Sequence, residues 1–483
     1  MQVHDKLFIG GEWVAPATSA TIEVTSPHTE EVIARVPEAS PADVDNAVAA
    51  ARVAFDEGPW PRMEPAERAD VMAKVSQTIQ ARSQDYAETI TREMGSPISW
   101  SIMGQVFAST MVLDYYTGLA RTYPFEELRD GVLGNKAIVR KEPVGVAGAI
   151  VPWNVPLFVT MLKLAPAMAA GATVVLKPAP ETPLDAYLLA EALHEAGLPP
   201  GVVNIVPAGR EVGEHLVTHP GVDKIAFTGS TAAGKRIAAL CGEQLKRVTL
   251  ELGGKSAAII MDDAEIGTVI PNLIGASLMN NGQACVAQTR ILASRDRYQE
   301  VVDALCDAVS QQQVGDPLDP ATTVGPLVAE RQRRRVEGYI ATGQEEGAKI
   351  AVGGGRPASQ ATGWYVEPTV FVNVDNHMTI AREEIFGPVL TVLPFDGVDE
   401  AVRIANDSDY GLSGSVWSGD NAAALEVARR VRTGTYTVNG FMLEFSCPFG
   451  GFKQSGVGRE LGPEGLAAYL EAKSISLPAG FEP

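Results

Sequence analysis

Cysteine is scarce in this sequence, and its spacing argues against two common frameworks. The 483-residue chain has four cysteines and no C-x-x-C pair. A chain of this length can bury a large core without disulfides, so we expect no disulfide framework and a reducing, cytoplasmic location. The six histidines are scattered and show no H-E-x-x-H spacing, so we expect no metal site.

Basic charge and long apolar runs are also in short supply. Lys and Arg number 39 against 59 Asp and Glu, which gives a net charge of −20. Such a surface repels nucleic acids and anionic membranes, so neither is an expected partner. The apolar stretch 144–176 is interrupted by prolines, Asn154 and Lys163, and leaves no window of ~20 apolar residues for a membrane span. The first residues lack a basic segment followed by an apolar run, so we expect no signal peptide.

Apolar strands and helices alternate through the middle of the chain. The expected strands cover 144–151, 172–177, 202–207, 224–229 and 247–252, and the expected helices cover 157–170, 184–195, 211–218 and 230–241. This alternation predicts βαβ units and a parallel sheet with helices on both faces. Ligands of such sheets bind at the carboxyl ends of the strands.

The flanking regions have their own patterns. Capped helices are expected from Ser40, after Glu64 and over 83–94, and 132–139 is expected to be extended. The second half alternates less regularly and predicts a second α/β domain. Its strand candidates are 291–293, 350–352, 389–393, 413–417 and 435–439.

The stretch F-T-G-S-T-A-A-G-K-R, residues 227–236, nearly matches a phosphate-binding P-loop. Arg236 occupies the position where that motif needs a hydroxyl to bind Mg²⁺, which argues against a phosphotransferase. The loop still follows a strand and opens a helix. It is therefore either an anion site at a helix N-terminus or a plain strand-to-helix turn.

Residues suited to covalent catalysis occur in three separate segments. Cys285 lies in N-N-G-Q-A-C, Glu251 near the end of a strand, and Asn154 just after another strand. A thiol nucleophile, a general base and an amide that stabilises an oxyanion could meet at one sheet edge. Each residue also has a structural interpretation: a small buried thiol, a solvated carboxylate and a turn-forming amide.

The chain resembles the aldehyde dehydrogenase superfamily from about residue 7 to residue 476. The resemblance rests on L-F-I-G-G-E-W-V, P-W-N-V-P, L-K-P-A-P-E-T-P, F-T-G-S-T-A-A-G, L-E-L-G-G-K-S, N-N-G-Q-A-C, E-E-I-F-G-P-V and P-F-G-G-F-K-Q-S-G-V-G-R-E-L-G. It implies that Cys285 attacks the aldehyde to form a thiohemiacetal, while Asn154 and the Cys285 backbone N–H hold the oxyanion. Hydride then passes to the nicotinamide, and Glu251 activates the water that hydrolyses the thioester. A base at Glu251 implies the hydrolytic branch of the superfamily, in which water releases the acyl group, rather than the branch that transfers the acyl group to coenzyme A.

The resemblance also implies the residues around these groups. The cofactor-binding residues would be Ile150, Val151, Pro152, Trp153, Lys177, Gly213, Phe227, Gly229, Ser230, Leu252, Glu384 and Phe386. The substrate tunnel would be lined by Val155, Val159, Val286, Phe441 and Phe449. Lys177 would bond the adenosine ribose, Gly229 and Ser230 would face the pyrophosphate, and Glu460 would be a second acid near the water route.

Cofactor and substrate preference are less fully specified. Many NAD-preferring relatives carry Glu three residues after the strand-ending lysine, where this chain has Pro180. Nothing at that position repels a 2′-phosphate, so we expect NAD, with NADP possible. The segments around Val155 and Phe441 suggest an apolar, medium-sized aldehyde and contain no arginine to bind a carboxylate. A dedicated semialdehyde or amino-aldehyde dehydrogenase is the alternative, and a non-catalytic binding or structural protein on this fold is the alternative of another class.

The family fold implies a domain division for the chain. Residues 1–122 and 144–252 would form a Rossmann-like NAD(P)-binding domain, and 253–468 a second α/β catalytic domain. Residues 123–143 and 469–483 would form a small β arm. That arm normally pairs protomers, so a homodimer or homotetramer is expected.

Overall fold

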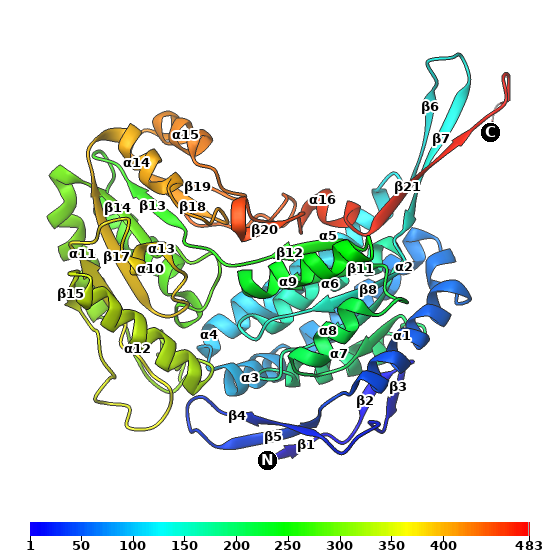
Figure 1. Cartoon of the computed structure of the whole chain (residues 1–483), viewed down its shortest axis with the longest axis horizontal. Coiled ribbons are helices and arrows are strands. Elements are labelled where there is room, and N and C mark those ends of the chain that lie inside the picture. The colour runs from blue at the N-terminus through cyan, green and yellow to red at the C-terminus, as the bar shows by residue number, and fades with distance from the viewer. Residues whose placement is uncertain (482) are drawn as a thin grey trace.

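A computed structural model describes residues 1–481 and 483 of the chain. Its first large sheet has the strand order β20-β12-β11-β8-β9-β10-β2-β3 and lies in the centre of Figure 1. The strands from β12 to β10 are parallel, whereas β20 and the β2–β3 pair are antiparallel to their neighbours. The strand bounds are β2 Leu7–Ile9, β3 Glu12–Val14, β8 Val146–Ile150, β9 Thr173–Lys177, β10 Val203–Ile205, β11 Lys224–Thr228, β12 Arg247–Glu251 and β20 Gly456–Val457. The predicted parallel sheet is therefore confirmed.

Helices cover both faces of this sheet. They are α1 Pro41–Asp56, α2 Pro65–Ala81, α3 Ser83–Met94, α5 Ala108–Thr122, α6 Pro156–Ala170, α7 Leu184–Glu195, α8 Arg210–Thr218 and α9 Thr231–Glu243. Successive residues of β8 face opposite sides, so Ala147 joins the core beneath α6 while Val146 joins the core beneath α8. The predicted cap of α1 is confirmed, because Ser40 and Asp43 form a reciprocal capping box.

The second large sheet has the order β15-β16-β17-β14-β13-β18-β19 and is parallel except for β15. Its strands are β13 Ala257–Ile260, β14 Arg290–Ser294, β15 Lys349–Val352, β16 Thr369–Val372, β17 Val389–Phe395, β18 Gly414–Trp417 and β19 Thr437–Val438. The helices beside it are α10 Ile266–Leu278, α11 Tyr298–Ser310, α12 Glu330–Glu345, α13 Thr379–Arg382, α14 Gly397–Asn406 and α15 Asn421–Arg430. Sequence analysis missed β13 and β16, because a strand of four residues is too short to show a periodicity.

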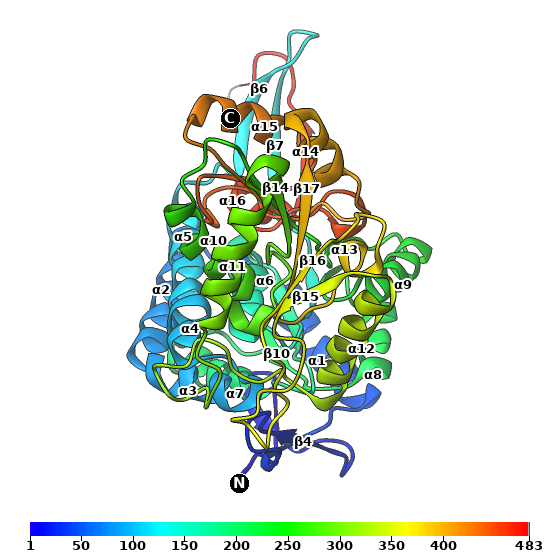
Figure 2. The same cartoon turned by 90° about the vertical axis from the view of Figure 1, so that its left-hand side faces the viewer.

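A narrow arm projects from the body in both cartoon views (Figures 1 and 2). It consists of β6 Glu126–Asp130, β7 Lys136–Pro143 and β21 Leu470–Ser476, paired antiparallel in the order β21-β7-β6. The expectation that 132–139 is extended throughout is wrong at its start. Gly131 donates its N–H to Asn135 across a turn, and β7 begins only after it.

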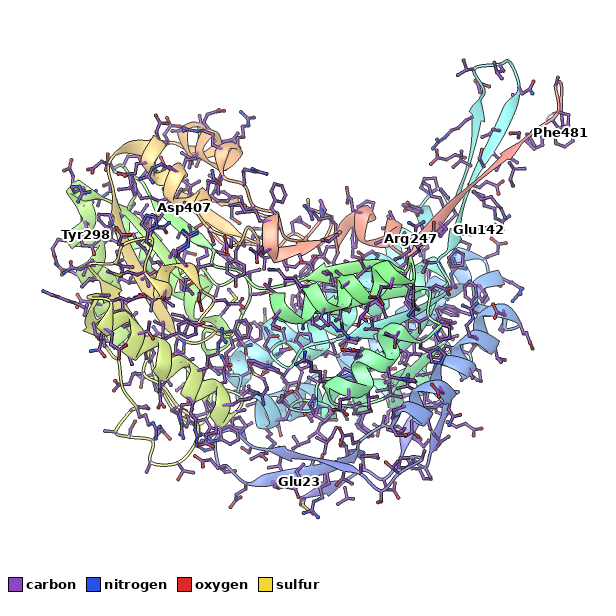
Figure 3. All side chains as sticks on the ribbon, viewed as in Figure 1. Glu23, Glu142, Arg247, Tyr298, Asp407 and Phe481 are labelled. Atoms are coloured by element: carbon purple, nitrogen blue, oxygen red, sulfur yellow. The ribbon has the colours of Figure 1, made fainter. Side chains whose placement is uncertain are left out.

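The base of the arm is attached to the first sheet. Arg247 at the start of β12 forms an ion pair with Glu471 of β21, and Glu471 lies opposite Glu142 of β7. Figure 3 labels Arg247 and Glu142 at this junction. It shows Phe481 on the side of the arm that faces away from the body. The arm is therefore connected to the sheet that carries the candidate site.

Several further elements lie outside the two large sheets. They are a small sheet of β1 Gln2–Val3, β4 Thr21–Thr25 and β5 Val32–Pro37, the helices α4 Ile98–Trp100 and α16 Gly462–Ala467, and a π-helical segment, η2, at Ser101–Phe107. β20 comes from the region assigned to the catalytic domain, yet it pairs with β12 of the first sheet. In the described part of the chain, no helix is long and apolar enough to cross a membrane.

Candidate active site

Strand ends and the segment after α10 converge on one cavity of about 440 Å³. β8 ends just before Asn154, β12 ends at Glu251, and a short turn after α10 leads to Cys285. All three side chains line the cavity, as the sequence predicted. They meet because the carboxyl ends of parallel strands lie at the same edge of a sheet.

The turn that carries Cys285 has an unusual backbone. Asn280, Asn281 and Gly282 have φ angles of 53°, 62° and 73° in succession. Asparagine and glycine are the residues that adopt this left-handed region at the lowest cost. The Asn281 amide also donates to the carbonyls of Gly95 and Pro326, at 2.8 and 2.9 Å. The N-N-G-Q segment is therefore a buried support for the cysteine, a role that the sequence did not reveal.

Two glycines after Glu251 allow the surrounding backbones to approach closely. A Cβ on Gly254 would lie 2.3 Å from the Cys285 carbonyl oxygen, and one on Gly253 would lie 2.6 Å from a carboxyl oxygen of Glu384. Real Cβ atoms do not make contacts this short. The Gly254 N–H in turn donates to the Glu384 carboxyl group at 2.8 Å. The L-E-L-G-G motif thus places the cysteine loop, Glu251 and Glu384 within one compact wall.

The Cys285 thiol is only partly buried but stands among acidic groups. Burial, together with the charges of Glu384 and Glu251, raises the pKa of this thiol to about 12. The protein alone therefore holds this cysteine as a thiol at neutral pH. Because only the thiolate is strongly nucleophilic, its reactivity depends on removing the proton or on a bound cation.

Asn154 is buried at the N-terminal side of α6. Its side-chain amide donates to the carbonyl of Gln283 at 2.9 Å, and its own carbonyl accepts from the Asn280 amide at 2.8 Å. These bonds couple the P-W-N-V-P segment to the cysteine turn. Since an amide has two N–H donors, one is left to face the cavity.

Glu251 is deeply buried, and neither of its carboxyl oxygens has a partner among the described residues. Burial raises its pKa well above the usual range, and the nearby charge of Glu460 adds to the shift. Glu460 accepts a 2.7 Å bond from Lys163, whose ammonium also donates to Thr228 at 2.6 Å. Lys163 partly opposes the shift at Glu251. A carboxyl group with a raised pKa and free oxygens is suited to moving protons near neutral pH.

The predicted cofactor residues divide into two groups. Pro152, Trp153, Gly229, Ser230, Leu252, Glu384 and Phe386 line the cavity. Ile150, Val151, Lys177, Gly213 and Phe227 are buried outside its lining. Ile150 lies opposite Phe227 in the sheet, and a Cβ on Gly213 would touch the Lys177 side chain at 3.4 Å.

Sequence analysis missed two polar residues of α12 that line the cavity. Gln332 donates its amide to the Phe386 carbonyl at 2.6 Å, and Arg335 donates to the Glu384 carbonyl at 2.7 Å. Phe386 has a φ of 65° and packs edge-to-face against Trp153 with 5.4 Å between ring centroids. A polar helix with several arginines has no motif that would single out these two positions.

The other side of the cavity is apolar. All five predicted tunnel residues, Val155, Val159, Val286, Phe441 and Phe449, line it. Phe445, from the segment that suggested an apolar aldehyde, lines the same wall, whereas sequence analysis missed Trp100, Phe158 and Leu162 there. Phe158 and Phe445 have ring centroids 6.0 Å apart although they are far apart in sequence. Trp100 precedes η2, a segment that no sequence pattern predicted.

The near P-loop at 227–236 is a strand-to-helix turn. Ser230 caps α9 by accepting the N–H of Ala233 at 3.3 Å. Lys235 bonds the Gln454 side chain, and Arg236 forms an ion pair with Glu214, so both point away from the turn into solvent-exposed contacts. Thr228, Gly229 and Ser230 are the residues of this stretch that line the cavity.

Comparison with known proteins identifies this chain as an α/β oxidoreductase. A family model described as the Aldehyde dehydrogenase family matches residues 13–475, and the chain belongs to that family. It is 50% identical to the geranial dehydrogenase of Castellaniella defragrans, over 98% of this chain and 99% of the relative. It is 42% identical to a 3-succinoylsemialdehyde-pyridine dehydrogenase of a Pseudomonas species, over 98% and 99% of the two chains.

Solved structures agree with this assignment. The aldehyde dehydrogenase of Mycobacterium tuberculosis in complex with NAD+ is 50% identical and has a TM-score of 0.98, covering 100% of this chain and 99% of that one. Aldehyde dehydrogenase C of Pseudomonas syringae, in complex with NAD+ and octanal, is 43% identical with a TM-score of 0.95, over 98% and 96% of the two chains. The resemblance inferred from the motifs and the aldehyde dehydrogenase fold are thereby confirmed.

Proposed function

We propose that this chain oxidises an apolar, medium-sized aldehyde to its carboxylic acid, with NAD+ as the hydride acceptor and Cys285 as the nucleophile. One observation carries the proposal. Cys285, Asn154 and Glu251 line a single cavity whose remaining substrate wall is apolar. A nucleophile, an oxyanion donor and a base are the groups that acyl transfer through a thioester requires.

The residues on the opposite wall fit a dinucleotide. Ser230 starts α9 with backbone N–H groups suited to a pyrophosphate, and the Glu384 carboxyl group can accept from ribose hydroxyls. The close approach allowed by Gly253 leaves that carboxyl group beside the cysteine loop. Two similar structures are described as NAD+ complexes. When bound, NAD+ supplies the hydride acceptor and a positive ring charge.

Cys285 would release its thiol proton to solvent and add as the thiolate to the aldehyde carbon, forming a thiohemiacetal. The carbonyl oxygen then becomes an oxyanion, which the free Asn154 N–H and the Cys285 backbone N–H would hold. This interaction strengthens as charge develops, so it lowers the barrier rather than only binding the substrate. Loss of hydride from the same carbon leaves the acyl group as a thioester on the Cys285 sulfur.

Glu251 would remove a proton from the water that attacks this thioester. Its unpartnered oxygens leave room for a water molecule to bond there. Hydrolysis releases the acid and returns a proton to Cys285, so one aldehyde and one water yield one carboxylic acid, one hydride and one proton. Glu460 and Lys163 lie behind Glu251 and would modulate its charge.

The wall chemistry favours alkyl or terpenoid aldehydes. Phe158, Phe445 and Leu443 line the substrate side, and the arginine at the cavity, Arg335, lies on the cofactor side beside Glu384. The names of two similar proteins mention geranial and octanal, which are apolar aldehydes of this size. The 3-succinoylsemialdehyde-pyridine dehydrogenase favours the alternative of a larger, functionalised aldehyde.

A substrate screen tests the proposal. Purified enzyme is incubated with NAD+ and with alkanals, geranial-type enals, aromatic aldehydes, semialdehydes and amino aldehydes, and NADH absorbance is followed. We expect the highest kcat/KM with apolar aldehydes and no activity in Cys285→Ala. Best activity on a carboxylate-bearing aldehyde contradicts the substrate class. Absence of NADH formation with every aldehyde favours the non-catalytic alternative.

We also propose that the arm pairs protomers, so that the cytoplasmic enzyme is a homodimer or homotetramer. The support is geometric: β6, β7 and β21 project from the body, and Val132, Leu133 and Phe481 are exposed on or beside them. Light scattering on the purified protein measures the mass directly. A monomer at micromolar concentration contradicts the proposal.

A further inference from the structure

We propose that the ion pair between Glu181 and Arg331 holds the two sides of the cofactor wall together and thereby slows the release of NADH. Glu181 lies in the connection from β9 to α7, beside the first sheet, and Arg331 is the second residue of α12, beside the second sheet. Neither side chain lines the cavity, so both are positioning residues. The inference rests on the proposed function, because it takes the cofactor to bind against this wall.

Helix α12 supports one side of the cofactor wall through its first two turns. Gln332 donates its amide to the Phe386 carbonyl at 2.6 Å, and Arg335 donates to the Glu384 carbonyl at 2.7 Å. Phe386 has a φ of 65°, a left-handed conformation that a bulky residue keeps only where its surroundings hold it. Arg331 directly precedes Gln332, so a force on Arg331 acts on the helix that holds the segment from Glu384 to Phe386.

The connection after β9 supports the opposite side of the wall. The Thr182 hydroxyl donates to the Trp153 carbonyl at 3.2 Å, and Trp153 lines the cavity just after the end of β8. The Trp153 ring packs edge-to-face against Phe386, with 5.4 Å between the ring centroids. Glu181 directly precedes Thr182. These contacts therefore form a closed ring, which the ion pair between Glu181 and Arg331 completes.

The ion pair is the partly exposed member of this ring. The Glu181 side chain is 18% exposed and the Arg331 side chain is 61% exposed. Solvent therefore screens the pair, and its loss should have a modest effect, well below that of removing a catalytic group. Without the pair, α12 can move away from the connection after β9, which loosens the wall that Phe386 and Trp153 form. A bound cofactor then leaves faster, because its residence time depends on the contacts that keep the site closed.

The rate of NADH release tests this inference without turnover. NADH is bound to the purified enzyme, excess NAD+ displaces it, and the decay of NADH fluorescence in a stopped-flow instrument gives the dissociation rate. The variants are Arg331→Gln and Glu181→Gln. We expect each of them to release NADH about threefold faster than the wild type, which is the range expected for the loss of a screened ion pair.

The matched control is Arg334→Gln, which removes the same charge from the same helix. Arg334 pairs with Glu330 of α12 itself and therefore joins no other element. Its variant should change the release rate less than about 1.5-fold. An equal increase in Arg334→Gln overturns the inference, as does a release rate that Arg331→Gln leaves unchanged. Arg331 is largely exposed, so its variant keeps the test valid if Glu181→Gln folds poorly.

Two further readouts separate an effect of this pair from a general weakening of the fold. The variant that carries both changes should release NADH no faster than either single variant, because all three lose the same interaction. Raising the salt concentration should speed release from the wild type and leave the Gln variants nearly unchanged, because salt screens the pair. Effects of the two changes that multiply, or a salt response that both Gln variants retain, overturn the inference.

The failure of the inference can be told apart from the failure of the proposed function. An enzyme that oxidises no aldehyde, but releases NADH faster in both Gln variants, contradicts the function and upholds the inference. An enzyme that oxidises aldehydes, but releases NADH at the same rate in every variant, upholds the function and overturns the inference. An enzyme that binds no NADH contradicts both.

Discussion

The two ends of the active-site cavity are built in different ways. The proposed cofactor end consists of strand ends, close-packed glycines and buried charges, such as Gly253, Ser230 and Glu384. The proposed substrate end consists of aromatic and aliphatic side chains from three distant segments, including Trp100, Phe158 and Phe445. The first kind of wall tolerates little change, because backbone contacts define it. The second can change specificity by exchanging side chains on loops and helices.

The largest expected effect follows from replacing Cys285, which lies between the cofactor end and the substrate end of the cavity. Cys285→Ala should abolish aldehyde oxidation, with a loss of more than about 10³-fold in kcat, because no other thiol lines the cavity among the described residues. NAD+ affinity measured by calorimetry should stay within about threefold of the wild type, since cofactor contacts lie on the other wall. Residual turnover near the wild-type rate would mean that Cys285 is not the nucleophile.

Glu251→Gln should lower kcat by about 10²- to 10⁴-fold, because the water that hydrolyses the thioester loses its base. Thioester formation should survive, so rapid mixing should show one burst of NADH per active site followed by slow turnover. Mass spectrometry of quenched enzyme should detect the acyl adduct on Cys285. A variant that loses the burst as well would indicate a role for Glu251 before hydrolysis.

The wild-type pH profile tests the same carboxyl group. Burial and Glu460 raise the pKa of Glu251, so the deprotonated base is populated only at higher pH. The deacylation rate should therefore rise with pH over a range above the one usual for a glutamate, and then level off. Alkylation of apoenzyme by iodoacetamide should also accelerate with pH, because the pKa of Cys285 is about 12. Deacylation that falls over this range would exclude Glu251 as the base.

Asn154→Ala should lower kcat/KM by about 10²- to 10³-fold through loss of one oxyanion donor. Part of the loss comes from the cysteine turn, because Asn154 also bonds Gln283 and Asn280. Asn154→Asp is the comparison variant, because it keeps the size of the side chain but brings a negative charge toward the oxyanion. Its kcat/KM should be at least as low as that of Asn154→Ala. Steady-state kinetics with a good apolar aldehyde measures both, and a milder effect for the Asp variant would contradict the role of the amide.

The smallest expected effect lies on the substrate wall. Phe445→Ala should lower kcat/KM for octanal by about tenfold, because a packed aromatic surface next to Phe158 is lost. Acetaldehyde, which does not reach this wall, should be affected less than about twofold. The ratio of wild-type to variant kcat/KM, measured for a series of alkanals, gives the contribution of this wall at each chain length. An equal loss for every chain length would show that Phe445 supports the fold instead.

Much of the fold followed from local patterns. The alternation of apolar runs and helical stretches predicted β8, β9, β11 and β12 to within about two residues, because buried parallel strands are continuous apolar runs. Short elements such as β13 and η2 were not predicted. The backbone geometry of the cysteine turn could not be predicted either, because long-range bonds hold its left-handed residues. Asn280 bonds Asn154, and Asn281 bonds Gly95 and Pro326.

The residues of the candidate site also divide into those that the sequence predicted and those that it did not. Cys285, Glu251 and Asn154 could be singled out because each sits in a motif with a chemical reason. Gln332 and Arg335 could not, since they lie on a polar helix whose pattern only indicates a solvated face.

By itself, the sequence determined the family, the parallel sheet and the identity of the reactive side chains, because these depend on residue type and on short-range order. Only the tertiary structure decided what surrounds them. It raised the pKa values of Glu251 and Cys285 by burying them together. Electrostatic effects depend on distance and burial in space, and those are set by packing between segments far apart in the chain.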